Sequence, residues 1–163
     1  SGNWNEFEAA ENTTGIHPYW ATYRLCYSKS LAEAERNNLA AFDAIFIEGK
    51  ESGQMSVKAR RAALFIMLYR GYPIFHLPFQ LLNNLLEIDE QMSTWRYRHM
   101  NMVQRMIGTR IGTGGSSGAG YLKAAMDKHY IFKELAQLNS FLVDRKKLPV
   151  LGKEVGEKLG YNF

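Results

Sequence analysis

Apolar side chains recur at steps of three and four residues along the segment 78–108. One histidine shares this pattern, and the full set is Leu81, Leu82, Leu85, Ile88, Met92, Trp95, His99, Met102, Val103 and Met106. Such spacing places side chains on one face of a helix. Pro78 suits a first helical turn, where the missing amide hydrogen would have no partner. The pattern therefore predicts a long helix over 78–108 that crosses the whole domain.

Two shorter helices are predicted before this segment. Ser30 and Glu33 have the spacing of a capping box, so one helix is expected to begin at Ser30 and continue through 31–47. Its predicted inward positions are Leu31, Ala34, Leu39, Phe42, Ile45 and Phe46. A second helix is expected from near Ser56 to Gly71, because glycine and a following turn signal end it.

A glycine-rich segment over 112–118, GTGGSSG, follows the long helix. Ser116 or Ser117 can cap a further helix over 121–142. Residues 1–28 show no clear periodicity, and no stretch alternates apolar and polar residues as strands do. We therefore predict an all-α fold, a helical bundle with one long central helix and a glycine-rich loop, in a single domain over 1–163.

Composition limits the classes of function. The 163 residues suffice for one domain with a real core. Cys26 is the single cysteine, which fits a reducing cytoplasm. No apolar run approaches the roughly 18 residues of a membrane span. The formal net charge is +4, but lysine and arginine are scattered, so neither a membrane nor a nucleic acid is an expected partner.

His99 has two interpretations. A lone histidine on an apolar helical face is commonly a core residue. Alternatively, its imidazole is an axial ligand to haem iron, and its apolar neighbours form a wall for the macrocycle. That wall would comprise Met92, Trp95, Met102 and Val103. Arg96, Arg98 and Arg105 would then meet the haem propionates or, for the last two especially, form a solvated face.

The glycine-rich segment also has two interpretations. It is either a flexible connector between helices or a loop whose backbone amides approach a ligand closely. In the second case the hydroxyl of Thr113 would help to hold a carboxylate or ammonium group.

Three blocks of sequence, taken together, resemble the tryptophan 2,3-dioxygenase family. They are Leu77-Pro78-Phe79-Gln80-Leu81-Leu82, Trp95-Arg96-Tyr97-Arg98-His99 and Gly112-Thr113-Gly114-Gly115-Ser116-Ser117-Gly118. Their order and spacing match the C-terminal part of the family's chain, and a looser similarity extends from about Ser30 to about Leu142.

The resemblance implies a helical, haem b-dependent enzyme that is typically a homotetramer. It implies that both atoms of dioxygen add across the indole C2–C3 bond of L-tryptophan, which gives N-formylkynurenine. His99 matches the proximal ligand of the haem iron, and the matching blocks place Trp95, Arg96 and Gly114 beside the cofactor. Thr113 matches the residue that contacts the amino-acid end of the substrate.

The resemblance also implies a missing part. The family's distal histidine and carboxylate-binding arginine belong to its N-terminal half, and His17, Arg24 and His76 lie in no matching motif. We therefore expect no catalytic residue in this chain, the N-terminal part of the same enzyme as a partner, and poor haem binding by this chain alone. The alternatives are a haem-dependent aromatic amino-acid hydroxylase of the same superfamily and a cofactor-free helical interaction module.

Overall fold

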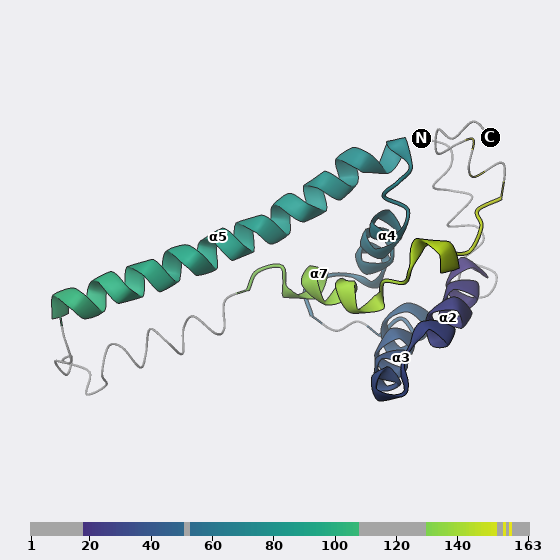
Figure 1. The fold of residues 1–163 in the computed structure, drawn as a ribbon, viewed down its shortest axis with the longest axis horizontal. Helices are drawn as coiled ribbons and strands as arrows, with labels where there is room; N and C mark the ends of the chain where they lie inside the picture. Colours follow the sequence, from purple (N-terminus) through teal and green to yellow (C-terminus); the bar gives the residue numbers. More distant parts are fainter. Residues whose placement is uncertain (1–17, 51–52, 108–129, 153–154, 156, 158–163) are drawn as a thin grey trace. The chain divides into compact units, whose positions relative to one another are not determined.

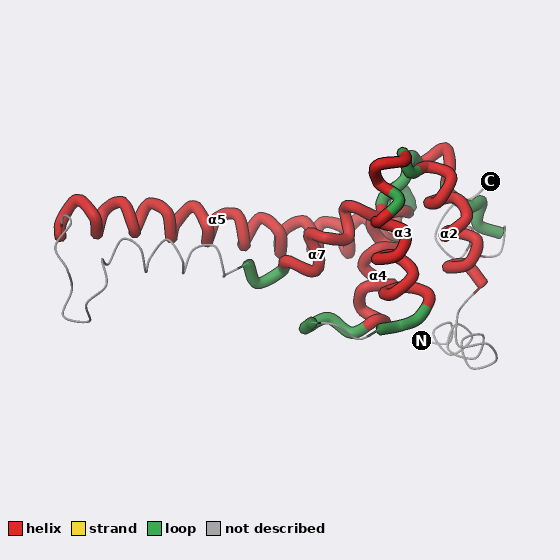
Figure 2. Tube along the Cα trace, turned by 90° about the horizontal axis from the view of Figure 1, so that it is seen from below, coloured by secondary structure: helices red, strands yellow, loops and turns green. Residues whose placement is uncertain are grey.

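The computed structural model describes residues 18–50, 53–107, 130–152, 155 and 157. Every regular element in these residues is helical and none is a strand (Figure 2), so the predicted all-α class is confirmed. The α-helices of the described residues include α2 (Pro18–Ser30), α3 (Asn37–Phe42), α4 (Val57–Leu68), α5 (His76–Ile107) and α7 (Lys133–Gln137) (Figure 1). None of the described helices combines the length and apolar character that a membrane span needs.

Shorter turns connect these helices. Single 3₁₀ turns cover Glu33–Glu35, Pro73–Phe75, Leu138–Phe141 and Arg145–Lys147, and a π-helical turn covers Asp43–Ile47. The chain divides into two compact units, one of Ser1–Phe79 with Gln137–Phe163 and the other of Gln80–Ala136. The single domain over 1–163 stays a prediction.

The core of the first unit is aromatic. Trp20, Tyr23 and Tyr27 recur at helical spacing along α2 and are buried against Phe42 and Phe46. The rings of Phe42 and Phe46 stack with centroids 4.7 Å apart, and those of Trp20 and Phe46 with centroids 5.2 Å apart. Burial of such large rings supplies most of the stabilisation that a small unit gains from its core.

Tyrosine hydroxyls join this core to the C-terminal part of the unit. Tyr23 Oη donates to the carbonyl oxygen of Phe141 at 2.6 Å, and Tyr27 Oη donates to that of Ser140 at 2.9 Å. Tyr69 Oη donates to the carbonyl oxygen of Pro149 at 2.9 Å. Burial raises the pKa of Tyr23 and raises the pKa of Tyr69 to about 12, because the interior disfavours the phenolate. These hydroxyls therefore remain donors over the physiological pH range.

The first predicted helix is wrong at its beginning. Ser30 ends α2 instead of capping a helix, and its Oγ donates to the carbonyl oxygen of Cys26 at 2.8 Å. Ala32 has an extended backbone, so the chain breaks there and the expected helix divides into a 3₁₀ turn, α3 and a π-helical turn. Phe42 and Phe46 are buried as predicted, whereas Ala34 is exposed.

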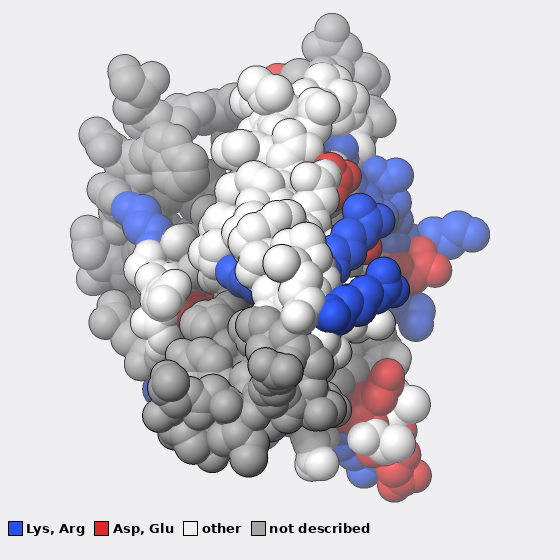
Figure 3. Space-filling view, turned by 90° about the vertical axis from the view of Figure 1, so that its left-hand side faces the viewer, with Lys and Arg blue, Asp and Glu red and all other residues white. Residues whose placement is uncertain are grey.

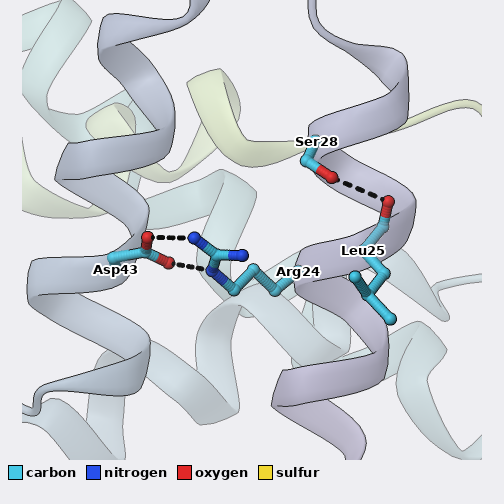
Figure 4. A network of polar contacts seen from close by, with 4 residues as sticks. All are labelled: Arg24, Leu25, Ser28 and Asp43. Atoms are coloured by element: carbon cyan, nitrogen blue, oxygen red, sulfur yellow. Dashed lines mark hydrogen bonds and ion pairs between the residues drawn. The ribbon is translucent and has the colours of Figure 1, made fainter.

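An ion pair links α2 to the π-helical turn. Arg24 Nε donates to Asp43 Oδ1 at 2.5 Å and Arg24 Nη2 donates to Asp43 Oδ2 at 2.6 Å, so the two planar groups meet through two parallel bonds (Figure 4). This geometry favours charge-assisted hydrogen bonds. The carboxylate in turn raises the pKa of the Arg24 guanidinium.

The next two predicted helices are present, although α4 ends at Leu68, three residues before the predicted end at Gly71. Ser56 is the N-cap of α4, and its Oγ accepts a hydrogen bond from the Ala59 amide at 3.2 Å. The long helix is α5, one uninterrupted helix that begins two residues earlier than predicted (Figure 1). The helix expected over 121–142 lies partly outside the described residues. Its described part contains only α7 and the 3₁₀ turn Leu138–Phe141.

Candidate functional site

One face of α5 carries a row of apolar side chains that the described residues leave exposed. Its exposed apolar side chains are Leu81, Ile88, Met92, Trp95, Met102 and Met106. We define the apolar row of α5 as these residues together with Leu85 and His99, which lie between them on the same face. Steps of four and three alternate along it. Trp95 is 58% exposed and Met106 is 77% exposed. A contiguous apolar surface of this kind is typical of a binding face.

His99 lies in the C-terminal half of this row, and its ring is stacked on that of Trp95. The two ring centroids are 5.2 Å apart and the ring planes differ by 9°. The residues are four positions apart, so the helix itself brings them together. The imidazole is exposed, so the described residues do not build a core around it.

Positive side chains lie on both sides of the apolar row. At 100° per residue, Arg98 and Arg105 lie along one flank two turns apart, and both are exposed. Arg96 lies on the opposite flank and is half-buried. Figure 3 looks onto the C-terminal end of α5, where uncharged side chains cover much of the helix and lysine and arginine gather along a flank. These charges would attract an anionic ligand to the edge of the row.

Asp89 lies on the same flank as Arg96 but is buried, with 4% of its surface exposed. Its Oδ1 accepts a hydrogen bond from the Ile131 amide at 2.9 Å, and its Oδ2 accepts one from the Phe132 amide at 2.6 Å. The chain is therefore attached to α5 just before α7 begins. Sequence reasoning missed this residue, because one aspartate within a helical pattern carries no signal of a partner more than forty positions away.

The sequence-predicted site residues divide into two groups. His99, Trp95 and Arg96 lie together on α5, within little more than one turn. Thr113 and Gly114 lie outside the described residues. The described group fits a haem, because an accessible imidazole can bind iron and the adjacent methionine and indole side chains offer an apolar surface to a flat macrocycle.

Known proteins resemble most of the chain. A family model described as tryptophan 2,3-dioxygenase matches residues 20–142. The tryptophan 2,3-dioxygenase of Bdellovibrio bacteriovorus is 43% identical over 143 residues, which is 83% of this chain and 40% of that protein. The tryptophan 2,3-dioxygenase of Alteromonas mediterranea is 46% identical over 127 residues, 74% of this chain and 35% of that protein.

A eukaryotic relative gives a similar match. The tryptophan 2,3-dioxygenase of Dictyostelium discoideum is 43% identical over 141 residues, 82% of this chain and 35% of that protein. The chain thus spans between 35% and 40% of the length of these three relatives. The family match covers well over half of the chain. These findings show that the chain belongs to the tryptophan 2,3-dioxygenase family.

Proposed function

We propose that this chain is the haem-binding, C-terminal part of a haem b-dependent dioxygenase. The enzyme would cleave the indole C2–C3 bond of L-tryptophan with dioxygen and release N-formylkynurenine. The observation that carries the proposal is the exposed imidazole of His99, stacked on Trp95 within the apolar row of α5. Family membership supports it, because the matched relatives are named for this reaction.

Each residue of the site has a proposed role. His99 would bind the haem iron through an imidazole nitrogen, and the parallel indole of Trp95 would restrain the rotation of its ring. Arg96 and Gly114 would help to hold the cofactor, and Thr113 would bind the amino-acid end of L-tryptophan. When bound, haem b supplies the iron centre at which dioxygen reacts with the indole. The protein's part is to orient the substrate and keep bulk water from that centre.

The apolar row of α5 is long enough to contact other partners besides haem. From Leu81 to Met106 the row covers 26 residues, and its two ends lie roughly 38 Å apart along the helix. We propose that haem covers the part around His99. The N-terminal part of the enzyme and other subunits of a homotetramer would cover the rest. We assign the enzyme to the cytoplasm, because Cys26 is the single cysteine of the sequence.

The visible absorption spectrum of the complete enzyme tests this function. We expect a haem Soret band that shifts when L-tryptophan is added, and a ring-opened N-formyl product under air. A Soret band that does not shift when L-tryptophan is added would contradict L-tryptophan as the substrate. If no Soret band appears after haem is added to the complete assembly, this result would contradict haem as the cofactor and favour the cofactor-free helical interaction module.

A further inference from the structure

Trp95 and His99 form a stacked pair on α5 although both side chains are exposed. Their ring centroids lie 5.2 Å apart and their planes differ by 9°. Parallel rings at this separation are offset, which is one of the arrangements that aromatic rings prefer. Both residues belong to one continuous helix, so the contact is formed by α5 itself and needs no surrounding core.

The stack restricts the side-chain torsion of His99 that a helix leaves free. The preceding turn limits χ1 of a helical side chain, whereas rotation of an imidazole about χ2 is broad. Among the described residues no hydrogen bond fixes either ring nitrogen of His99, and the indole of Trp95 is the ring packed against it. The indole therefore restricts the imidazole to orientations near one plane before any ligand binds.

The stack leaves the ring nitrogens of His99 accessible to a metal. The lone pair that binds iron lies in the plane of the imidazole, whereas the indole covers a face of that ring. A macrocycle whose iron is bound in that plane stands across the imidazole. The indole, parallel to the imidazole, then presents its edge to the macrocycle and not its face. This geometry gives Trp95 a role other than the flat wall for haem that the sequence suggests.

We propose that Trp95 is a positioning residue for haem binding, because its indole sets the plane of the His99 imidazole in advance. This inference rests on the proposed function, in which His99 is the axial ligand. Groups that orient a metal-binding histidine strengthen the binding, since less rotational freedom is lost when the metal binds. Loss of the indole should therefore weaken haem binding and loosen the orientation of the imidazole, while His99 remains the ligand.

The test replaces Trp95 by leucine in the complete haem-loaded enzyme. We expect the rate of haem dissociation, measured by transfer to excess apomyoglobin, to rise about threefold to tenfold, the range that one aromatic pair contributes. The iron–histidine stretching band in the resonance Raman spectrum of the ferrous enzyme should shift or broaden, because the imidazole samples more orientations. The Soret band of histidine-ligated haem should remain.

Two further variants make the test specific. Trp95→Phe keeps a ring that can stack on His99, so it should recover most of the haem retention and the original Raman band. Tyr97→Leu removes another exposed aromatic ring from α5. Two positions along a helix differ by about 200°, so Tyr97 lies on the opposite side of α5 from Trp95. This control should leave both the dissociation rate and the Raman band unchanged.

Two results would overturn the inference. In the first, Trp95→Leu releases haem at the rate of the unsubstituted enzyme. In the second, Trp95→Leu releases haem faster but keeps the original iron–histidine band, which would make Trp95 only an apolar contact of the haem. If the unsubstituted enzyme binds no haem through His99, the proposed function fails instead. The ring-current shift of the His99 ring protons in the haem-free enzyme would then still report on the stack.

Discussion

The hydroxyl of Tyr23 offers a direct test of how the first unit is held together. Tyr23 is fully buried, and its Oη donates at 2.6 Å to the carbonyl oxygen of Phe141, 118 positions away. Tyr23→Phe removes this bond but keeps the ring and its contacts with neighbouring aromatic rings. The carbonyl oxygen of Phe141 then remains in the protein interior without the hydrogen bond from Tyr23.

We expect this change to lower the free energy of unfolding by about 1–2 kcal/mol. A typical buried hydrogen bond contributes about 1 kcal/mol, and an acceptor left without a partner adds a desolvation cost of similar size. For a protein of this size the loss corresponds to a fall in Tm of roughly 2–8 °C. Urea and thermal denaturation followed by far-UV circular dichroism would measure both quantities.

Tyr97→Phe is the matched control, because the Tyr97 side chain is 54% exposed on α5 and water replaces any partner of its hydroxyl. It should change stability by less than about 0.5 kcal/mol. If Tyr23→Phe were as stable as the unsubstituted protein, or if both variants lost the same stability, the hydroxyl would not link α2 to the C-terminal segment as described.

Two other predictions concern the same unit. Burial raises the pKa of Tyr23, and that of Tyr69 to about 12, from an ordinary value of 10.0, so the folded state keeps these protons longer than the unfolded state. The free energy of unfolding, measured in urea over a pH series, should therefore decrease as the pH rises from about 10 through 12. A free energy of unfolding that stays constant over this pH range would contradict the prediction. Asp43→Asn should cost about 1 kcal/mol in the same assay, because it disrupts the paired bonds with Arg24, whereas neutralising the exposed Glu33 should cost almost nothing. Equal losses in the two variants would refute this difference.

Local signals predicted the middle of the chain well. The beginning of α4 follows from Ser56, which caps its own helix, and the extent of α5 from an apolar period sustained over about eight turns. The stacking of His99 on Trp95 follows from their separation of four positions within that helix. These features need no information from distant residues.

Features set by tertiary contacts were missed. The aromatic residues of α2 do recur at helical spacing, but polar residues between them hid the period, and the buried rings stabilise a helix that propensity alone does not indicate. Ser30 has the sequence of an N-cap, yet its hydroxyl bonds to its own preceding turn. Asp89 bonds to backbone amides, which every residue except proline has, so the sequence could not identify its partners.

The most direct test of the account is the absorption spectrum of the complete enzyme carrying His99→Ala, compared with His76→Ala. His76 is an exposed histidine at the beginning of the same helix, so it controls for the loss of any imidazole from α5. We predict that His99→Ala loses the Soret band of histidine-ligated haem and that His76→Ala retains it. A His99→Ala enzyme with the unchanged histidine-ligated spectrum would contradict the assignment of His99 to the haem iron.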